Sequence, residues 1–99
     1  GQTNYSAAKA GMHGFTMALA QEVARKGITV NSVSPGYIAT SMVMEIDEEI
    51  RNDLVSQIPM QRMGKPSEIA NTVGFLASND ADYITGANIP VNGGLFTSF

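Results

Sequence analysis

The feature that most constrains the fold is a long helical stretch that ends at a glycine and leads into a short run of β-branched residues. Residues 4–26 contain no proline, and Gly27 follows where a left-handed helix cap favours glycine. Residues 28–33 then predict a strand, which Pro35 and Gly36 stop. A helix, a short turn and an apolar strand in this order predict an α/β fold with a doubly wound sheet. In such sheets ligands bind beyond the carboxyl ends of strands, which is where residues 34–40 fall.

Alanine and glycine make up much of the predicted first helix. Gly11 and Gly14 lie in its interior, where each costs about 1 kcal/mol relative to Ala. Packing is the better explanation for residues of such low helix propensity. We therefore expect a neighbouring element to approach this helix closely.

The stretch over 41–58 has apolar residues at helical spacing, Ile46, Ile50 and Leu54, with charged residues mostly on the other side. Methionines flank it: Met42, Met44, Met60 and Met63. One interpretation is a mobile lid over an acyl substrate. The other is an ordinary amphipathic helix with flexible core filler, and both stay open.

A further helix is predicted to begin at Pro66, since proline suits the first helical turn. Its expected buried stripe consists of Ile69, Val73, Leu76 and Ala77. A last strand is predicted over 88–91, before the turn at 92–94. With two strands and about three helices, residues 1–99 are expected to form a single partial domain.

Composition excludes several functional classes. The 99 residues include six Lys and Arg against nine Asp and Glu, and the net charge of −3 argues against nucleic-acid binding. There is no cysteine, which excludes disulfides and thiolate metal sites, and no metal site is expected. No apolar run approaches the length of a membrane span. We expect a soluble, cytoplasmic chain.

Tyr5 and Lys9 are the residues best suited to chemistry, because positions four apart share one face of a helix. A phenol has a pKa of about 10, too high for ready proton exchange at neutral pH. An ammonium about 4 Å away stabilises the phenolate by roughly 4 kcal/mol at an effective dielectric of about 20. That energy corresponds to about three pKa units, enough for Tyr5 to act as a general acid/base. On its own, the same spacing also describes an ordinary solvated pair.

The context of this pair resembles the short-chain dehydrogenase/reductase family along the whole chain. The pair opens a small-residue helix, and I-T-V-N-S-V-S-P-G follows at 28–36. Further matching motifs are R-M-G-K-P-S-E-I-A at 62–70, F-L-A-S at 75–78, I-T-G at 84–86 and V-N-G-G at 91–94. The resemblance implies the C-terminal portion of a Rossmann-like doubly wound parallel sheet and an oxidoreductase acting on CH-OH groups.

The resemblance also implies roles for individual residues. Tyr5 matches the family's catalytic tyrosine, which protonates the carbonyl oxygen as hydride arrives. Lys9 matches the lysine that lowers the tyrosine pKa and binds the nicotinamide ribose, so both residues also count as cofactor-binding. The loop that holds the nicotinamide matches Pro35, Gly36, Ile38 and Thr40. NADP(H) is the cofactor implied for the intact parent.

Within the family, the segments at 1–22 and 34–40 are most similar to reductases of 3-ketoacyl-CoA thioesters, which convert acetoacetyl-CoA to 3-hydroxybutyryl-CoA. Gln2 and Tyr37 match positions of substrate contact. Reductases of 3-oxoacyl groups on acyl carrier protein (ACP) share nearly all these motifs and remain the alternative. A homotetramer is implied for the intact parent.

Some parts of the family pattern have no counterpart here. The family's Gly-rich phosphate-binding turn and its catalytic serine belong upstream of Gly1. We therefore expect the 99 residues alone neither to bind NADPH tightly nor to turn over. The alternative class is a non-catalytic remnant or interaction module. In that case an interaction surface would be formed by Phe15, Ala18, Leu19, Ile89 and Val91, although the same residues also suit an ordinary core.

Overall fold

A computed structural model describes residues 2–95, with the side chains of Gln2, Thr3 and Tyr5 left out of the description. The chain divides into two compact units. The first unit runs to Ser32 and includes Phe75–Ile89, and the second consists of Val33–Gly74 and the chain from Pro90 onward. That residues 1–99 form one partial domain stays a prediction.

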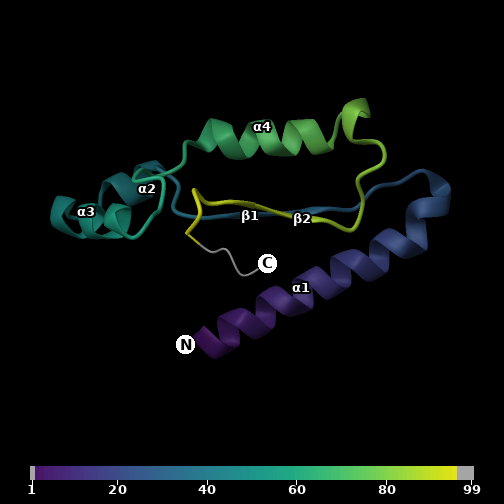
Figure 1. Ribbon diagram of the computed structural model, residues 1–99, viewed down its shortest axis with the longest axis horizontal. Coiled ribbons are helices and arrows are strands. Elements are labelled where there is room, and N and C mark those ends of the chain that lie inside the picture. The colour runs from purple at the N-terminus through teal and green to yellow at the C-terminus, as the bar shows by residue number, and fades with distance from the viewer. Residues whose placement is uncertain (1, 96–99) are drawn as a thin grey trace. The chain divides into compact units, whose positions relative to one another are not determined.

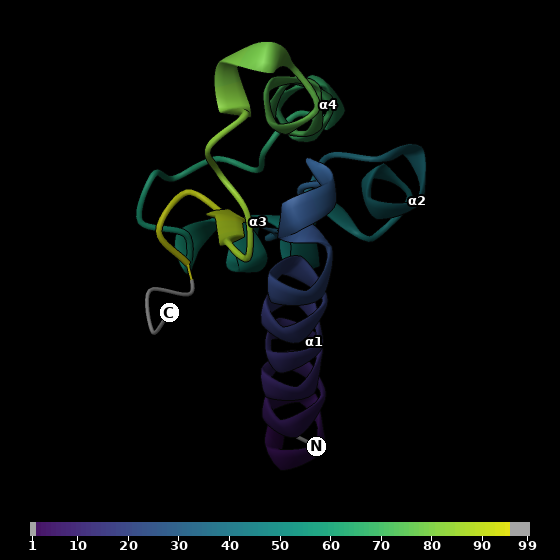
Figure 2. The ribbon, with the colours of Figure 1, turned by 90° about the vertical axis from the view of Figure 1, so that its right-hand side faces the viewer.

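The first unit begins with helix α1 (Gln2–Val23), which is unbroken in both views (Figures 1 and 2). A 3-10 turn, η1 (Ala24–Lys26), follows, and Gly27 closes it in the left-handed conformation at φ 75°. The Gly27 N–H donates to the Ala24 carbonyl at 3.0 Å. The predicted glycine cap is therefore confirmed, although the last turn of the helix tightens to 3-10 geometry.

Two strands, β1 (Ser32–Pro35) and β2 (Asn88–Val91), form the sheet (Figure 1). The Ser32 N–H donates to the Ala87 carbonyl, and the Gly36 N–H donates to the Val91 carbonyl. Both bonds join residues 55 apart, and a constant offset is the register of a parallel pair. The predicted α/β class with two parallel strands is confirmed.

The first strand lies later than the sequence predicts, over 32–35 instead of 28–33. Before Ser32 the two segments are joined largely through side chains: the Asn31 Oδ1 accepts from the Ala87 N–H, its Nδ2 donates to the Ile84 carbonyl, and the one backbone bond there runs from the Gly86 N–H to the Val30 carbonyl among the described residues. Pro35 belongs to the strand instead of stopping it. It tolerates this position because the Ser32 and Gly36 N–H groups face β2, and alternation turns the Pro35 nitrogen away.

The second unit holds most of the remaining helical structure. The stretch predicted as one amphipathic helix folds as two, α2 (Ser41–Met44) and α3 (Glu48–Ser56). Helix α4 (Pro66–Leu76) begins at the predicted proline and extends into the first unit at Phe75. A 3-10 turn, η2 (Asn79–Ala81), leads on toward β2.

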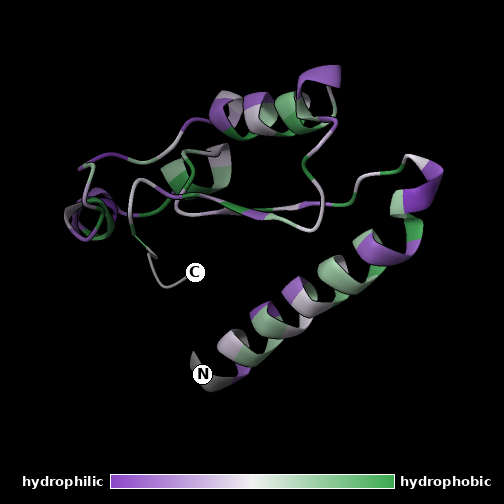
Figure 3. Ribbon diagram, turned by 45° about the vertical axis from the view of Figure 1, so that its right-hand side comes forward, coloured by the Kyte–Doolittle hydropathy of each residue, from purple (hydrophilic) through white to green (hydrophobic). Residues whose placement is uncertain are grey.

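Few described side chains are fully buried. In the first unit they are Thr16, Ala20 and Ala81, and in the second unit Ile58. The predicted buried stripe of α4 is wrong, because Val73 is 50% exposed and no residue of that helix is buried. Polar and apolar residues alternate along α1 instead of gathering on one side (Figure 3).

The close neighbour predicted for the glycines of α1 is absent from the described part of the chain. A Cβ placed on Gly11 or Gly14 would meet nothing within 4 Å. The approach occurs further along the helix, where a Cβ on Gly86 would lie 3.6 Å from the Ala20 Cβ. The small residues early in α1 therefore face no packed element among the described residues.

Candidate functional site

The loop after β1 begins at Gly36, which lies against the end of the other strand. The Gly36 N–H donates to the Val91 carbonyl at 3.0 Å. A Cβ on Gly36 would lie 2.7 Å from the Asn92 Cβ and 2.9 Å from its Cα. Only glycine fits this contact without a shift of backbone, so the contact explains why a glycine stands where the chain leaves the sheet.

The same loop is bonded to a second segment through a parallel bridge between Ile38 and Gly64. The Gly64 N–H donates to the Tyr37 carbonyl and the Ala39 N–H donates to the Gly64 carbonyl, each at 2.9 Å. Since groups alternate along an extended chain, the N–H of Ile38 itself points away from Gly64. It has no hydrogen-bond acceptor among the described residues.

Thr40 ends the loop and caps α2. Its Oγ1 accepts from the Val43 N–H at 3.3 Å, and its own N–H donates to the Ile38 carbonyl at 2.8 Å. A hydroxyl that accepts in a cap still has a hydrogen to donate. The loop thus offers two donors, the Ile38 N–H and the Thr40 hydroxyl. Such donors suit the carboxamide and phosphate oxygens of a dinucleotide.

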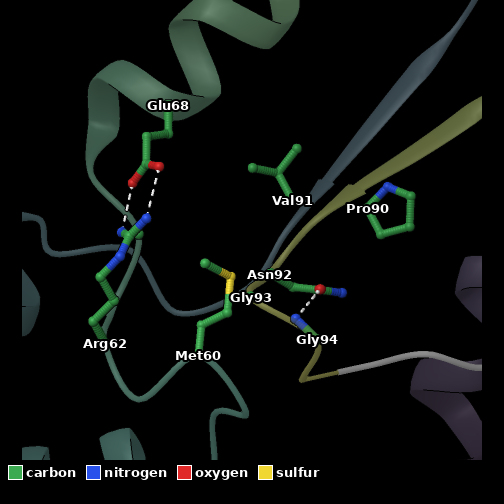
Figure 4. A pocket seen from close by; sticks show the side chains of 9 residues that line it. Met60, Arg62, Glu68, Pro90, Val91, Asn92, Gly93 and Gly94 are labelled. Carbon is green, nitrogen blue, oxygen red and sulfur yellow. Dashed lines mark hydrogen bonds and ion pairs between the residues drawn. The ribbon is translucent and has the colours of Figure 1, made fainter.

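An ion pair holds the segment that contains Gly64. Glu68 accepts two hydrogen bonds from the Arg62 guanidinium, at 2.8 and 3.0 Å (Figure 4). It accepts a third from the Lys65 N–H at 2.8 Å. These bonds lower the pKa of Glu68 to about 2, and the bonding from Arg62 has the largest effect. Both charged side chains are exposed, so solvent screens their attraction. The value of the pair here is geometric: it closes a loop around Gly64.

A pocket of about 330 Å³ adjoins this segment in the second unit (Figure 4). Its lining comes from the end of β2 with the turn after it, and from the segment 60–68: Met60, Arg62, Gly64, Glu68, Pro90, Val91, Asn92, Gly93 and Gly94. The Asn92 Oδ1 accepts from the Gly94 N–H at 2.9 Å and so shapes one wall. The predicted loop residues at 35–40 do not line this pocket.

The predicted site residues fall in both units. Pro35, Gly36, Tyr37, Ile38 and Thr40 follow one another in the second unit.

The predicted catalytic pair belongs to α1 in the first unit. The side chains of Tyr5 and of the predicted substrate contact Gln2 lie outside the described residues. Lys9 is half-buried one helical turn after Tyr5. The roles of these residues stay predictions.

The described residues contain no group of three or more His, Cys, Asp or Glu side chains that could hold a metal ion. Among them, no helix is both long and apolar enough to cross a membrane.

A family model described as enoyl-(acyl carrier protein) reductase matches residues 1–96. The chain belongs to this family of short-chain dehydrogenases/reductases. The match extends over nearly the whole chain and confirms the resemblance derived from the motifs.

Within this family, the chain is similar to two kinds of named reductase. The chain is 62% identical over 96 residues to the acetoacetyl-CoA reductase of Allochromatium vinosum and 59% over 95 residues to that of Cupriavidus necator. It is 58% identical over 98 residues to the 3-oxoacyl-[acyl-carrier-protein] reductase of Pseudomonas aeruginosa. These alignments cover 96–99% of the chain but only 39–40% of each relative. The relatives are oxidoreductases.

The sequence assigned no role to the residues that support the loop from outside. Gly64, Arg62 and Glu68 all belong to the motif at 62–70 that marked the family resemblance. This motif was the one sequence signal that could have pointed to these three residues. Its contact with Ile38, 26 positions earlier, depends on tertiary structure.

Proposed function

We propose that this chain supplies the proton donor and the nicotinamide-binding loop of an NADPH-dependent reductase of 3-ketoacyl thioesters. The reaction is the reduction of acetoacetyl-CoA to 3-hydroxybutyryl-CoA. The observation that carries the proposal is the likeness to two acetoacetyl-CoA reductases along 96–97% of the chain. Because the chain spans only about two fifths of their length, the proposal concerns the whole enzyme.

Tyr5 is the proposed proton donor. Its hydroxyl gives a proton to the ketone oxygen while that oxygen gains negative charge, and the Lys9 ammonium stabilises the phenolate that remains. A carboxyl or imidazole is not needed for this transfer, since one cation at helical spacing brings the phenol within range of neutral pH.

The loop at Pro35, Gly36, Ile38 and Thr40 is the proposed holder of the nicotinamide end of NADPH. The donor set fits: the Ile38 N–H has no acceptor among the described residues and the Thr40 hydroxyl retains a hydrogen. When bound, the dinucleotide supplies the hydride. The loop itself orients the nicotinamide ring, because its backbone is held in place by hydrogen bonds.

Gln2 and Tyr37 are the proposed substrate contacts. The acyl carrier is CoA in this proposal, because the relatives at 62% and 59% identity are named for acetoacetyl-CoA. Reduction of 3-oxoacyl-ACP is the alternative, favoured by the 58% identity to an ACP-dependent enzyme. Comparing kcat/KM for acetoacetyl-CoA and acetoacetyl-ACP on one preparation separates the two.

We further propose that the 99 residues alone are inactive and do not bind NADPH tightly. The described residues 2–95 hold two strands, and a two-stranded parallel pair exposes edges that a complete sheet covers. A homotetramer in the cytoplasm is the proposed state of the whole enzyme.

A hybrid reductase tests these roles. In it, the matching segment of the Allochromatium vinosum enzyme is replaced by the 96 aligned residues of this chain. We expect NADPH oxidation that depends on acetoacetyl-CoA, and no turnover by the 99 residues alone. Turnover by the isolated chain would refute its proposed inactivity. A hybrid that folds and binds NADPH but reduces no thioester would refute the substrate class.

The proton donor is tested by Tyr5→Phe in the hybrid. Loss of one general acid lowers kcat by about 10²–10⁴-fold, with NADPH binding retained. Tyr83→Phe is the matched control, because Tyr83 is fully exposed. Equal activity of the two variants would remove Tyr5 from the mechanism.

An interaction module is the second candidate function, and the surface of α1 supports it. Met12 and Phe15 are 66% and 68% exposed, three positions apart on the helix. Large apolar side chains so placed favour association. Mass measurement of the 99-residue chain in solution tests this: an assembly that Phe15→Ser dissociates supports the module, and a stable monomer refutes it.

A further inference from the structure

We propose that Gly64 is a positioning residue for the nicotinamide-binding loop, holding Ile38 at the place where its N–H meets the cofactor. This inference rests on the proposed function and adds to it a residue that lies outside the loop. Gly64 would act through Ile38 and touch neither cofactor nor substrate.

The bridge between the two residues is the first argument. Two backbone hydrogen bonds of 2.9 Å join Gly64 to the residues on either side of Ile38. They fix the peptide planes before and after Ile38. The direction of the Ile38 N–H is therefore set from Gly64, 26 positions away in the chain.

The side chain of Ile38 adds a second contact at the same point. A Cβ on Gly64 would lie 2.8 Å from the Ile38 Cδ1. Real Cβ atoms essentially never approach another heavy atom so closely, so Ile38 lies directly over the glycine. No positive φ is recorded at Gly64, so an alanine there meets no backbone strain. A glycine is needed at position 64 because the Ile38 side chain occupies the space that a Cβ would take.

Gly64 is itself held from both sides. Arg62 and the Lys65 N–H both donate to Glu68, and Arg62 Nη1 also donates to the Met63 carbonyl at 3.1 Å. The glycine thus stands in a short loop whose ends share one carboxylate. A support fixed in this way can transmit its position to Ile38, because the backbone on either side of it is tied down.

Gly64→Ala is expected to perturb cofactor binding while the protein folds. Among the described residues, the one atom under 3 Å from the added methyl group is the tip of a flexible side chain, which can rotate away. The methyl group is also expected to push the Ile38 backbone, and with it the N–H, away from residue 64, so that NADPH binding requires the loop to return against the clash. An off-rotamer side chain corresponds to roughly three- to tenfold weaker binding.

The test measures the dissociation constant of NADPH by nicotinamide fluorescence in the hybrid reductase, without thioester. Four variants are compared with the unaltered hybrid: Gly64→Ala, Ile38→Val, the double variant, and Gly74→Ala. Ile38→Val deletes the clashing Cδ1, so it provides the background in which the methyl group on residue 64 has room. Gly74→Ala is the matched control, because a Cβ there meets no described atom within 4 Å.

We expect Gly64→Ala to raise the NADPH dissociation constant three- to tenfold in the Ile38 protein. In the Ile38→Val background the same change should have less than half that effect on a logarithmic scale. The thermal unfolding midpoint of the Gly64→Ala single variant should stay within a few degrees of that of Gly74→Ala. A merely structural glycine would shift the midpoint without this dependence on residue 38.

An unchanged dissociation constant in Gly64→Ala, or an equal rise in both backgrounds, would overturn the positioning role alone. If the unaltered hybrid fails to bind NADPH, the proposed function falls and the positioning role with it. The two failures are therefore distinguishable in one titration series.

Discussion

Asn31 is predicted to stabilise the first unit through the two hydrogen bonds of its side chain. Its Oδ1 accepts from the Ala87 N–H at 3.0 Å, and its Nδ2 donates to the Ile84 carbonyl at 3.1 Å. Each such bond contributes about 1 kcal/mol net, and a partner left unpaired in a half-buried position costs about 1–3 kcal/mol. Asn31→Ala is therefore expected to lower the free energy of unfolding by about 2–4 kcal/mol.

Urea unfolding followed by circular dichroism measures this loss. Asn31→Asp separates the two bonds, because it keeps the acceptor for Ala87 and removes the donor to Ile84, and it should cost about 1–3 kcal/mol. Asn52→Ala is the matched control on exposed α3, expected within about 0.5 kcal/mol of the unaltered chain. If Asn31→Ala is no more destabilising than Asn52→Ala, the two hydrogen bonds of the Asn31 side chain do not stabilise the first unit.

Three further outcomes are expected. The pKa of Glu68 is lowered from 4.5 to about 2, so the stability that its bond to Arg62 contributes is complete above about pH 4.5 and is lost as the pH falls toward 2. The difference in unfolding free energy between the unaltered chain and Glu68→Gln, measured by urea titration, should therefore shrink as the pH falls over that range. Gly36→Ala should destabilise by about 1–3 kcal/mol, because the new Cβ meets the Cα of Asn92, which cannot rotate away; a midpoint equal to the unaltered one would refute the contact. Ile58→Ala should cost about 2–5 kcal/mol and Ile58→Val about 0.5–1.5, measured by the same denaturation, since Ile58 is the largest fully buried side chain among the described residues.

Local signals predicted the elements whose cause is local. Gly27 adopts the left-handed conformation, and Pro66 begins α4, because these properties belong to single residues. The bounds predicted for the first strand, 28–33 instead of 32–35, were wrong for the opposite reason. β-Branched residues favour a strand wherever they stand, whereas the Asn31 side chain bonds to a segment more than 50 positions later.

Burial was the least predictable property. The stripe over Ile69 and Val73 has helical spacing, yet Val73 is half-exposed and no residue of α4 is buried. An amphipathic pattern says which face would be covered and not what covers it. Gly11 and Gly14 illustrate the same limit, since small residues permit a close approach that the described chain does not make.

The sequence by itself determined the family, the α/β class and the order of elements, because motifs and periodicity are properties of neighbouring residues. It also placed Tyr5 and Lys9 one helical turn apart, which is a consequence of helix geometry alone. Only the tertiary structure decided what supports the loop after β1. The contacts of Gly36 with Asn92 and of Ile38 with Gly64 join segments that no local rule relates, and they exist because two later segments of the chain return to the loop after β1.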